Sequence, residues 1–202
     1  MYSEIIHQGE RGMATIHLAC ECGKVQGTAQ VPAPSSGNRV VCYCKDCQAF
    51  AEQLQPARIL TAHRGTAIFQ VSPSSVQWTK GAEQIRCLRL TPKGLYRWYA
   101  GCCQTPLANT LKPGFPFVGL IETAIVPEDR TEAHLGPIRA HAYPQHADPV
   151  LPEEILRTNR VWPMMIRIML KILGWKLTGK GHPNPFFSRD GQPKVQPEIV
   201  NK

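Results

Sequence analysis

The arrangement of the cysteines constrains this chain more than any other feature. Seven of the eight stand in three short groups: Cys20 and Cys22; Cys42, Cys44 and Cys47; Cys102 and Cys103. In a strand, residues two apart point to the same face, with Cα atoms about 6.5–7 Å apart, at or beyond the limit for a disulfide. A zinc ion with Zn–S distances of about 2.3 Å bridges such a gap easily. The spacing therefore favours metal binding.

Cysteines can also form disulfides, act as a redox pair or stay as inert thiols in the core, and the cellular compartment of the protein helps to decide among these uses. The first 20 residues show no secretory signal, and no segment is apolar for long enough to span a membrane. We therefore predict a cytoplasmic protein, in which a disulfide framework is not expected. A redox pair of Cys44 and Cys47 and a set of inert buried thiols stay open as alternatives. Cys87, which stands alone, is expected in the core.

The pattern of apolar residues predicts a mainly β protein with antiparallel sheets. Apolar alternation and turn signals indicate strands or hairpins over the first 130 residues. The segments 66–81 and 84–100 read as hairpins, the second turning at Thr91-Pro92-Lys93-Gly94. A helix is expected from about residue 46, with Asp46 as its N-cap.

The chain changes character near residue 140. We predict a zinc-binding β domain over 14–140, followed over 141–202 by a Pro-rich connection, an amphipathic helix and an irregular tail. The helix, over 163–176, is expected to pack on the protein's own body, with Trp162 and Trp175 as anchors, or to close over the zinc pocket. Peripheral contact with a membrane surface, or with a partner, is the alternative.

Three motifs carry a resemblance to a known family: "LACECGKVQG", "CYCKDCQAF" and "YRWYAGCCQTPLANT". The chain resembles the glutathione-dependent formaldehyde-activating (GFA) enzyme family over about residues 14–125. This resemblance implies an Mss4-like fold, in which antiparallel sheets surround zinc. It implies that Cys20 and Cys22 join the third motif in a structural zinc site. It also implies that Cys42, Cys44 and Cys47 hold a second, more labile zinc linked to chemistry.

The third motif departs from the family pattern. The family's CxxCG would fall on residues 100–104, where Ala100 replaces the first cysteine and Gln104 the glycine. Cys103 keeps its place and Cys102 is additional, but neighbours in an extended chain point to opposite faces. Both could therefore bind one ion only in a tight turn. The sequence leaves open whether one or two zinc ions bind.

The function expected from these residues is thiol–aldehyde chemistry. Three cysteine ligands leave a fourth zinc position open, as in catalytic sites. The resemblance implies a carbon–sulfur lyase that adds a thiol, such as that of glutathione, to an aldehyde. The candidates for proton transfer are Tyr43, Lys45, Asp46 and His63. The alternative is a non-catalytic zinc-stabilised binding module. Nucleic acid is not an expected partner, because the basic residues behind the net charge of +8 are dispersed.

Overall fold

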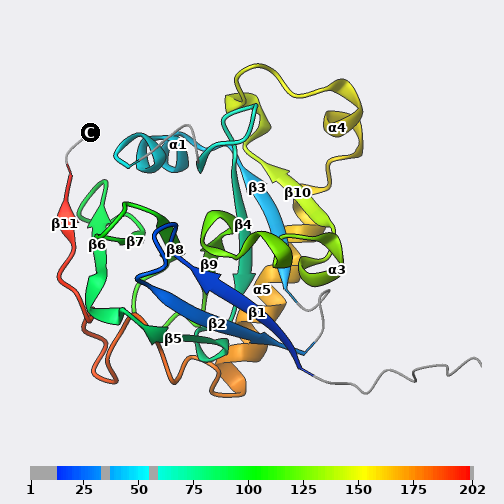
Figure 1. Cartoon of the computed structure of the whole chain (residues 1–202). Helices are drawn as coiled ribbons and strands as arrows, with labels where there is room; N and C mark the ends of the chain where they lie inside the picture. Colours follow the sequence, from blue (N-terminus) through cyan, green and yellow to red (C-terminus); the bar gives the residue numbers. More distant parts are fainter. Residues whose placement is uncertain (1–12, 33–36, 55–58, 201–202) are drawn as a thin grey trace, which may run out of the picture.

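The computed structural model describes residues 13–32, 37–54 and 59–200, and within them a mainly β fold (Figure 1). The strands are β1 (Ala14–Ala19), β2 (Gln26–Val31), β3 (Asn38–Cys42), β4 (Thr66–Val71), β5 (Val76–Lys80), β6 (Ile85–Arg89), β7 (Tyr96–Ala100), β8 (Pro106–Thr110), β9 (Val118–Ile121), β10 (Ile138–Ala142) and β11 (Glu198–Ile199). The α-helices are α1 (Lys45–Glu52), α3 (Glu132–Leu135), α4 (Glu153–Thr158) and α5 (Val161–Leu177).

The strands form two sheets. The smaller has the order β1-β2-β5, and the larger has the order β10-β3-β4-β9-β8-β7-β6-β11. Strand pairing is antiparallel throughout the small sheet and the middle of the large one, while the edge strands β10 and β11 pair in parallel with β3 and β6. The predicted class, mainly β with antiparallel sheets and a helix near the C-terminus, is confirmed.

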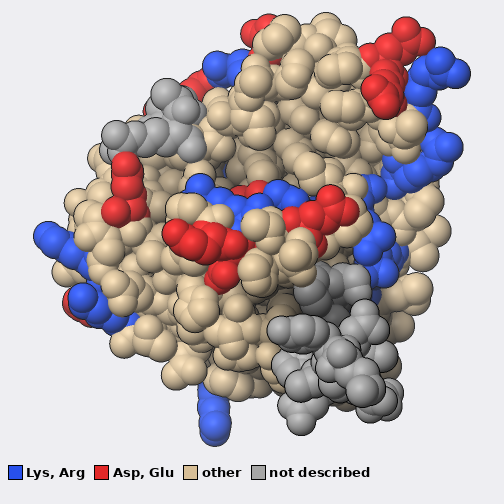
Figure 2. Space-filling view, turned by 45° about the vertical axis from the view of Figure 1, so that its right-hand side comes forward, with Lys and Arg blue, Asp and Glu red and all other residues tan. Residues whose placement is uncertain are grey.

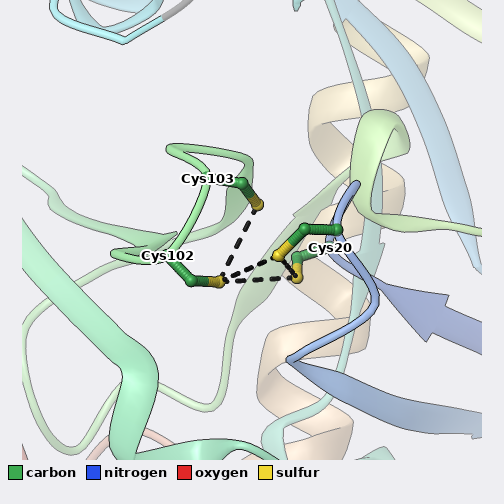
Figure 3. A group of neighbouring side chains, drawn as sticks. Cys20, Cys102 and Cys103 are labelled. Carbon is green, nitrogen blue, oxygen red and sulfur yellow. Dashed lines mark hydrogen bonds between the residues drawn. The ribbon is translucent and has the colours of Figure 1, made fainter.

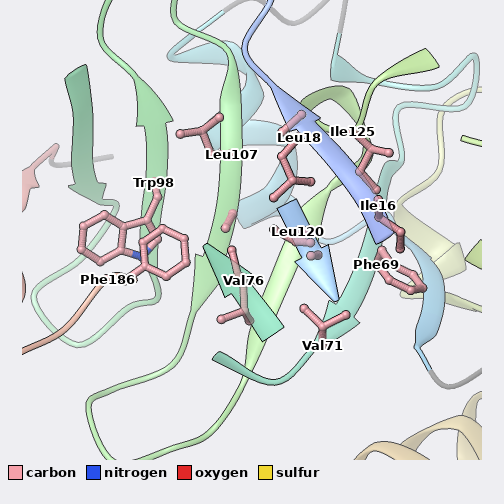
Figure 4. Close-up of a cluster of buried hydrophobic side chains, with 14 of the residues drawn as sticks. Ile16, Leu18, Phe69, Val71, Val76, Trp98, Leu107, Leu120, Ile125 and Phe186 are labelled. Atoms are coloured by element: carbon pink, nitrogen blue, oxygen red, sulfur yellow. The ribbon is translucent and has the colours of Figure 1, made fainter. Parts of the chain in front are cut away.

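The main core lies between the two sheets (Figure 4). Ile16 and Leu18 of β1 face Phe69 and Leu120 of the large sheet, and all four are at most 2 % exposed. The residues next to Phe69 and Leu120 in their strands point to the opposite face of the large sheet, because successive side chains of a strand alternate between its faces. Both faces of the large sheet are therefore available for packing.

Helix α5 packs against that second face. Its Met164 and Ile168 are buried beside Val40 and Ile68. The helix has 17 residues and is longer than the predicted 163–176. The helix thus packs on the protein's own large sheet, as predicted. Trp175, which is half-buried, packs against the same hydrophobic cluster. The expected role of Trp162 is wrong: its side chain is 80 % exposed, because it lies on the side of the helix that faces away from the sheet.

The C-terminal tail also enters the core. Phe186 stacks on Trp98 at 4.8 Å between ring centroids, and Phe187 meets the same indole edge-on at 5.8 Å. Further along, β11 adds a short parallel edge strand to β6. Phe186 and Phe187 thus share one hydrophobic cluster with residues of β1 and β2.

Two local predictions are wrong and two are confirmed. Segment 66–81 is not a hairpin: β4 pairs with β3 and β9, whereas β5 pairs with β2 in the other sheet. The N-cap of α1 is Cys44 and not Asp46, because the Cys44 sulfur accepts the Cys47 N–H. The hairpin of β6 and β7 forms, and the Gly94 N–H donates to the Thr91 carbonyl. Cys87 is a core residue, 3 % exposed.

The surface carries mixed charge. Figure 2 shows a face on which basic side chains run along the right-hand edge, while acidic and basic side chains alternate across the middle. The Arg39 guanidinium and the Glu122 carboxylate form a two-pronged ion pair, with N···O distances of 2.6 and 2.9 Å.

Within the described residues, no helix is both long and apolar enough to cross a membrane.

Candidate metal centres

The first centre joins the small sheet to the large sheet through two turns. Cys20 and Cys22 lie in the turn after β1, where the Gly23 N–H donates to the Cys20 carbonyl and Gly23 has φ +71°. Cys102 and Cys103 lie in the turn after β7. The packing of the two sheets brings the two turns together although they are about 80 residues apart, and the Glu21 N–H donates to Thr105 Oγ1 between them. These four thiols form the four-cysteine cluster (Figure 3).

The spacing of its sulfur atoms suits a tetrahedral metal ion. The Sγ–Sγ distances are 3.4 Å for Cys22 and Cys102, 3.6 Å for Cys20 and Cys22, and 3.8 Å for Cys20 and Cys102. A regular tetrahedron with Zn–S arms of about 2.3 Å has edges of about 3.8 Å. The four sulfurs lie within 4.8 Å of one another and form no disulfide. The cluster can therefore hold a metal ion with little rearrangement.

A tight turn over residues 100–105 allows the neighbouring residues Cys102 and Cys103 to reach the same cluster. The Gln104 N–H donates to the Ala100 carbonyl at 2.7 Å, and the Ala100 N–H donates to the Thr105 carbonyl at 2.8 Å. Gln104 has φ +58°, in the left-handed region that favours glycine. The turn points the sulfurs of Cys102 and Cys103 to the same side, 3.8 Å apart. Cys102 thus supplies the fourth thiol that Ala100 lacks.

The second centre lies where β3 passes into α1. Cys42 ends the strand, Cys44 caps the helix, and Cys47 occupies its first turn. The Cys44 sulfur accepts the Cys47 N–H at 3.4 Å, so the cap itself positions two of the three thiols. Their ligand atoms also lie within 4.8 Å of one another. Among the described residues no further His, Cys, Asp or Glu joins this three-cysteine cluster, which can hold a metal ion with one position left open.

A buried arginine faces the three-cysteine cluster. Arg97 of β7 is 1 % exposed, and its guanidinium lies 4.0 Å from the Cys47 sulfur and 3.3 Å from Asn109 Oδ1. It also lies over the Phe50 ring, 5.3 Å from the centroid. A buried cation is costly unless an anion lies close to it. The contact with Cys47 and the effect of the Arg97 charge on the pKa of Cys44 place this cation beside the thiols of the cluster.

Each cluster holds one thiol with a lowered pKa. Hydrogen bonds from Cys42 and Cys47 lower the pKa of Cys44 to about 2, helped by the Cys47 N–H and the charge of Arg97. Burial raises the pKa of Cys103, but hydrogen bonds from Thr105 and from backbone N–H groups outweigh it and lower that pKa to about 6. Each cluster therefore contains a thiolate at neutral pH, which is the form that binds metal.

Of the predicted proton-transfer residues, Tyr43 and His63 form hydrogen bonds outside the three-cysteine cluster, while Lys45 and Asp46 stand between Cys44 and Cys47 in the chain. Tyr43 is buried, and its hydroxyl lies 3.0 Å from His141 Nδ1 on the opposite side of the strand. His63 donates to the Pro149 carbonyl, and Lys45 and Asp46 are exposed on α1. Arg97, whose guanidinium contacts the Cys47 sulfur, is not among the predicted candidates. Strand alternation places it opposite Trp98, on a face that only the packing of α1 buries.

A cavity of about 710 Å³ adjoins the four-cysteine cluster. Cys20 and Cys103 form part of its wall, together with Thr105, Ile125 and Arg130. The Arg130 guanidinium donates to the carbonyls of Ile125 and Thr123, which fixes it at the edge of the cavity. The cavity therefore lies at the cluster with four thiols and not at the cluster with three.

Comparisons with known proteins give a family but no activity. The profile of a family described as a family of unknown function (DUF6151) matches residues 13–198. No curated protein matches the chain. A crystal structure of a Rhodobacter sphaeroides protein is similar, with 14% sequence identity and a TM-score of 0.43, over 60% of this chain and 96% of that one. Because the family profile spans nearly the whole described chain, the protein belongs to this family of unknown function.

Proposed function

We propose that this is a zinc-binding protein with two thiolate centres, and that the three-cysteine cluster carries GFA-like carbon–sulfur lyase chemistry. The observation that supports it most is the difference between the clusters: four thiols gather in one and three in the other. A structural zinc site is closed by four protein ligands, whereas a catalytic site keeps one position for water or substrate. The four-cysteine cluster is then structural, and the three-cysteine cluster is reactive.

The donor set supports zinc over harder cations. All seven groups are thiols, which suit zinc and copper(I) and do not suit magnesium or calcium. At the second centre, three thiolates and one Zn²⁺ give a net charge of −1, and the guanidinium of Arg97 brings the buried group to neutrality. Arg97 thus favours a centre with three thiolates and one divalent ion.

The chemistry assigned to the reactive centre joins a thiol to an aldehyde. The thiol sulfur adds to the aldehyde carbon, and the thiol proton ends on the aldehyde oxygen. Zinc bound at this centre would supply a place to hold a thiolate or to polarise the aldehyde oxygen. This chain's own part would be to keep the Cys44 thiol deprotonated through the α1 cap and the charge of Arg97. Glutathione and formaldehyde are the substrates that the motif resemblance suggests.

One observation favours a non-catalytic module as the second candidate. Cys47 is only 4 % exposed and Arg97 lies against it, so one side of the three-cysteine cluster is closed to ligands. In that case both zinc ions would serve the fold alone. The protein would then act through a surface and not through its centres.

Exchange spectroscopy by NMR separates the two candidates. Glutathione and formaldehyde combine spontaneously, and an enzyme speeds their exchange with S-(hydroxymethyl)glutathione. We expect the zinc-loaded protein to raise the exchange rate and Cys44→Ser to lose that increase. Cys87→Ser is the matched control, because this core cysteine belongs to neither cluster. An exchange rate equal to the spontaneous one, from a protein with both zincs bound, would reject the lyase and favour the module.

A further inference from the structure

Helix α5 presents a row of large apolar side chains on the side away from the sheet. Their exposed fractions run from 43 % to 80 %, in the residues Trp162, Met165, Ile166, Met169, Leu170, Leu173 and Leu177. Their spacings place them on one side of the helix, opposite the buried Met164 and Ile168. Single exposed apolar residues are ordinary, but a contiguous row indicates an interaction surface. We call these seven residues the outer face of α5.

Positive charge lies along the borders of this face. Arg167 and Lys171 follow one border and Lys176 lies on the other, and α5 contains no Asp or Glu. Burial lowers the pKa of Lys171, and the positive charges of Arg167, Arg139 and Lys180 lower it further. The cations are therefore crowded together beside the outer face, where they would attract a negatively charged partner.

An open depression on α5 combines the two features. Ile166 and Leu170 supply apolar walls, and Arg167 and Lys171 supply cations, with Pro163 at one end. A lipid has the matching chemistry, since an anionic head group would meet the cations while acyl chains cover the apolar residues. A second copy of this chain does not match, because an α5-to-α5 contact would bring cations together with no acidic residue on either helix.

We propose that α5 is a membrane-surface anchor, whose outer face enters the interface of an anionic lipid bilayer. Helices with an apolar face bordered by Lys and Arg lie in the bilayer plane, with that face about 5–10 Å deep. Docking through Met164 and Ile168 fixes the orientation of the outer face before any lipid is bound. The helix runs along the outside of the large sheet beside β10 (Figure 1), so the opposite edge of that sheet, at β11, would stay in water.

Vesicle sedimentation tests this anchor with the full chain. The probes are vesicles of phosphatidylcholine alone and of phosphatidylcholine mixed with phosphatidylserine. We expect binding to the anionic vesicles that weakens as salt is raised. The double variant Leu170→Gln, Leu173→Gln should bind about tenfold more weakly or worse, because it removes two apolar groups from the outer face. Ile199→Gln is the matched control: Ile199 is 48 % exposed on β11, and the substitution should leave binding unchanged.

Trp162 gives a second readout of the same contact. Its fluorescence should shift to the blue on binding, and lipids brominated along the acyl chain should quench it, with Trp162→Phe as the control. Circular dichroism checks that each variant is folded. Failure to bind anionic vesicles would overturn the proposal, as would binding that the double variant leaves unchanged. A dimer that the double variant dissociates, without vesicle binding, would assign the outer face to a second copy.

Discussion

At the scale of single residues, Arg97 links the three-cysteine cluster to the β-sheet. Its guanidinium has the Cys47 sulfur on one side, Asn109 on another and the Phe50 ring beneath it. A sequence reading misses this role, because an arginine in an alternating strand is expected in solvent. The residue is buried where α1, which carries Cys47 and Phe50, packs over it.

Arg97→Gln should weaken metal binding at the three-cysteine cluster. The substitution leaves buried thiolates without their cation, and loss of such outer-shell partners typically lowers metal affinity about 10–100-fold. Competition with a chromogenic chelator measures that affinity. Arg86→Gln on the neighbouring strand is the control, since Arg86 is exposed and contacts backbone carbonyls. Equal affinities for both variants would show that Arg97 is not coupled to the centre.

Cys102→Ser should remove one metal ion per chain from the four-cysteine cluster. The Cys102 sulfur lies within 3.8 Å of those of Cys20, Cys22 and Cys103, and among the described residues no further cysteine belongs to this cluster. Because metal binding is coupled to folding, the unfolding temperature should also fall. Cys87→Ser should keep the full metal content. If Cys102→Ser also kept it, Cys102 would not be a ligand.

At the scale of elements, α5 has two faces with different tasks. Met164 and Ile168 are each 5 % exposed and fill the space over β3 and β4, whereas the outer face meets solvent. The sequence predicts the helix and its apolar character. It does not say which apolar residues turn inward, because nearly every non-basic position is apolar and no polar side marks the solvent.

Met164→Ala should lower the free energy of unfolding by about 2–4 kcal/mol, since it leaves a cavity against the sheet. Met165→Ala, one position further along and 43 % exposed, should change it by less than about 0.5 kcal/mol. Urea denaturation followed by circular dichroism measures both. Similar losses for the two variants would mean that α5 is not oriented as described.

Local patterns predicted local features and failed at longer range. The hairpin of β6 and β7 was predictable because its turn residues lie within the segment itself. The supposed hairpin of β4 and β5 failed because nothing between residues 71 and 76 tells which sheet each strand joins. The thiols of the three-cysteine cluster were likewise predictable from one short motif. The closure of the other cluster by Cys102 depends on the left-handed turn at Gln104.

At the scale of the whole molecule, the tail and the β domain share their packing. Phe186 and Phe187 cover Trp98 at the centre of the core, and α5 covers the outer side of the sheet. The division into a β domain over 14–140 and a segment over 141–202 stays a prediction. The segment after residue 140 contributes Met164 and Ile168 to one face of the large sheet and Phe186 and Phe187 to the other.

A chain ending at Asn159 should therefore aggregate or lose cooperative unfolding. It would expose Trp98 and the face beneath α5, and losing even one buried Phe side chain typically costs about 3–5 kcal/mol. Soluble yield and the sharpness of the urea transition measure the effect, and Phe186→Ala is a milder companion variant. A soluble truncated chain with an unchanged transition would show that the tail is an accessory to an independent domain.

The most direct test of the account is the zinc content of three proteins, measured by native mass spectrometry. The account predicts two zinc ions in the wild-type chain and one in each of Cys22→Ser and Cys44→Ser. The ion that remains in Cys22→Ser is bound at the three-cysteine cluster. A chelator should remove it more easily than the ion that remains in Cys44→Ser, because the three-cysteine cluster offers three protein ligands and the other cluster four. A wild-type chain without zinc, or a Cys44→Ser variant that retains both ions, would contradict the two-centre account.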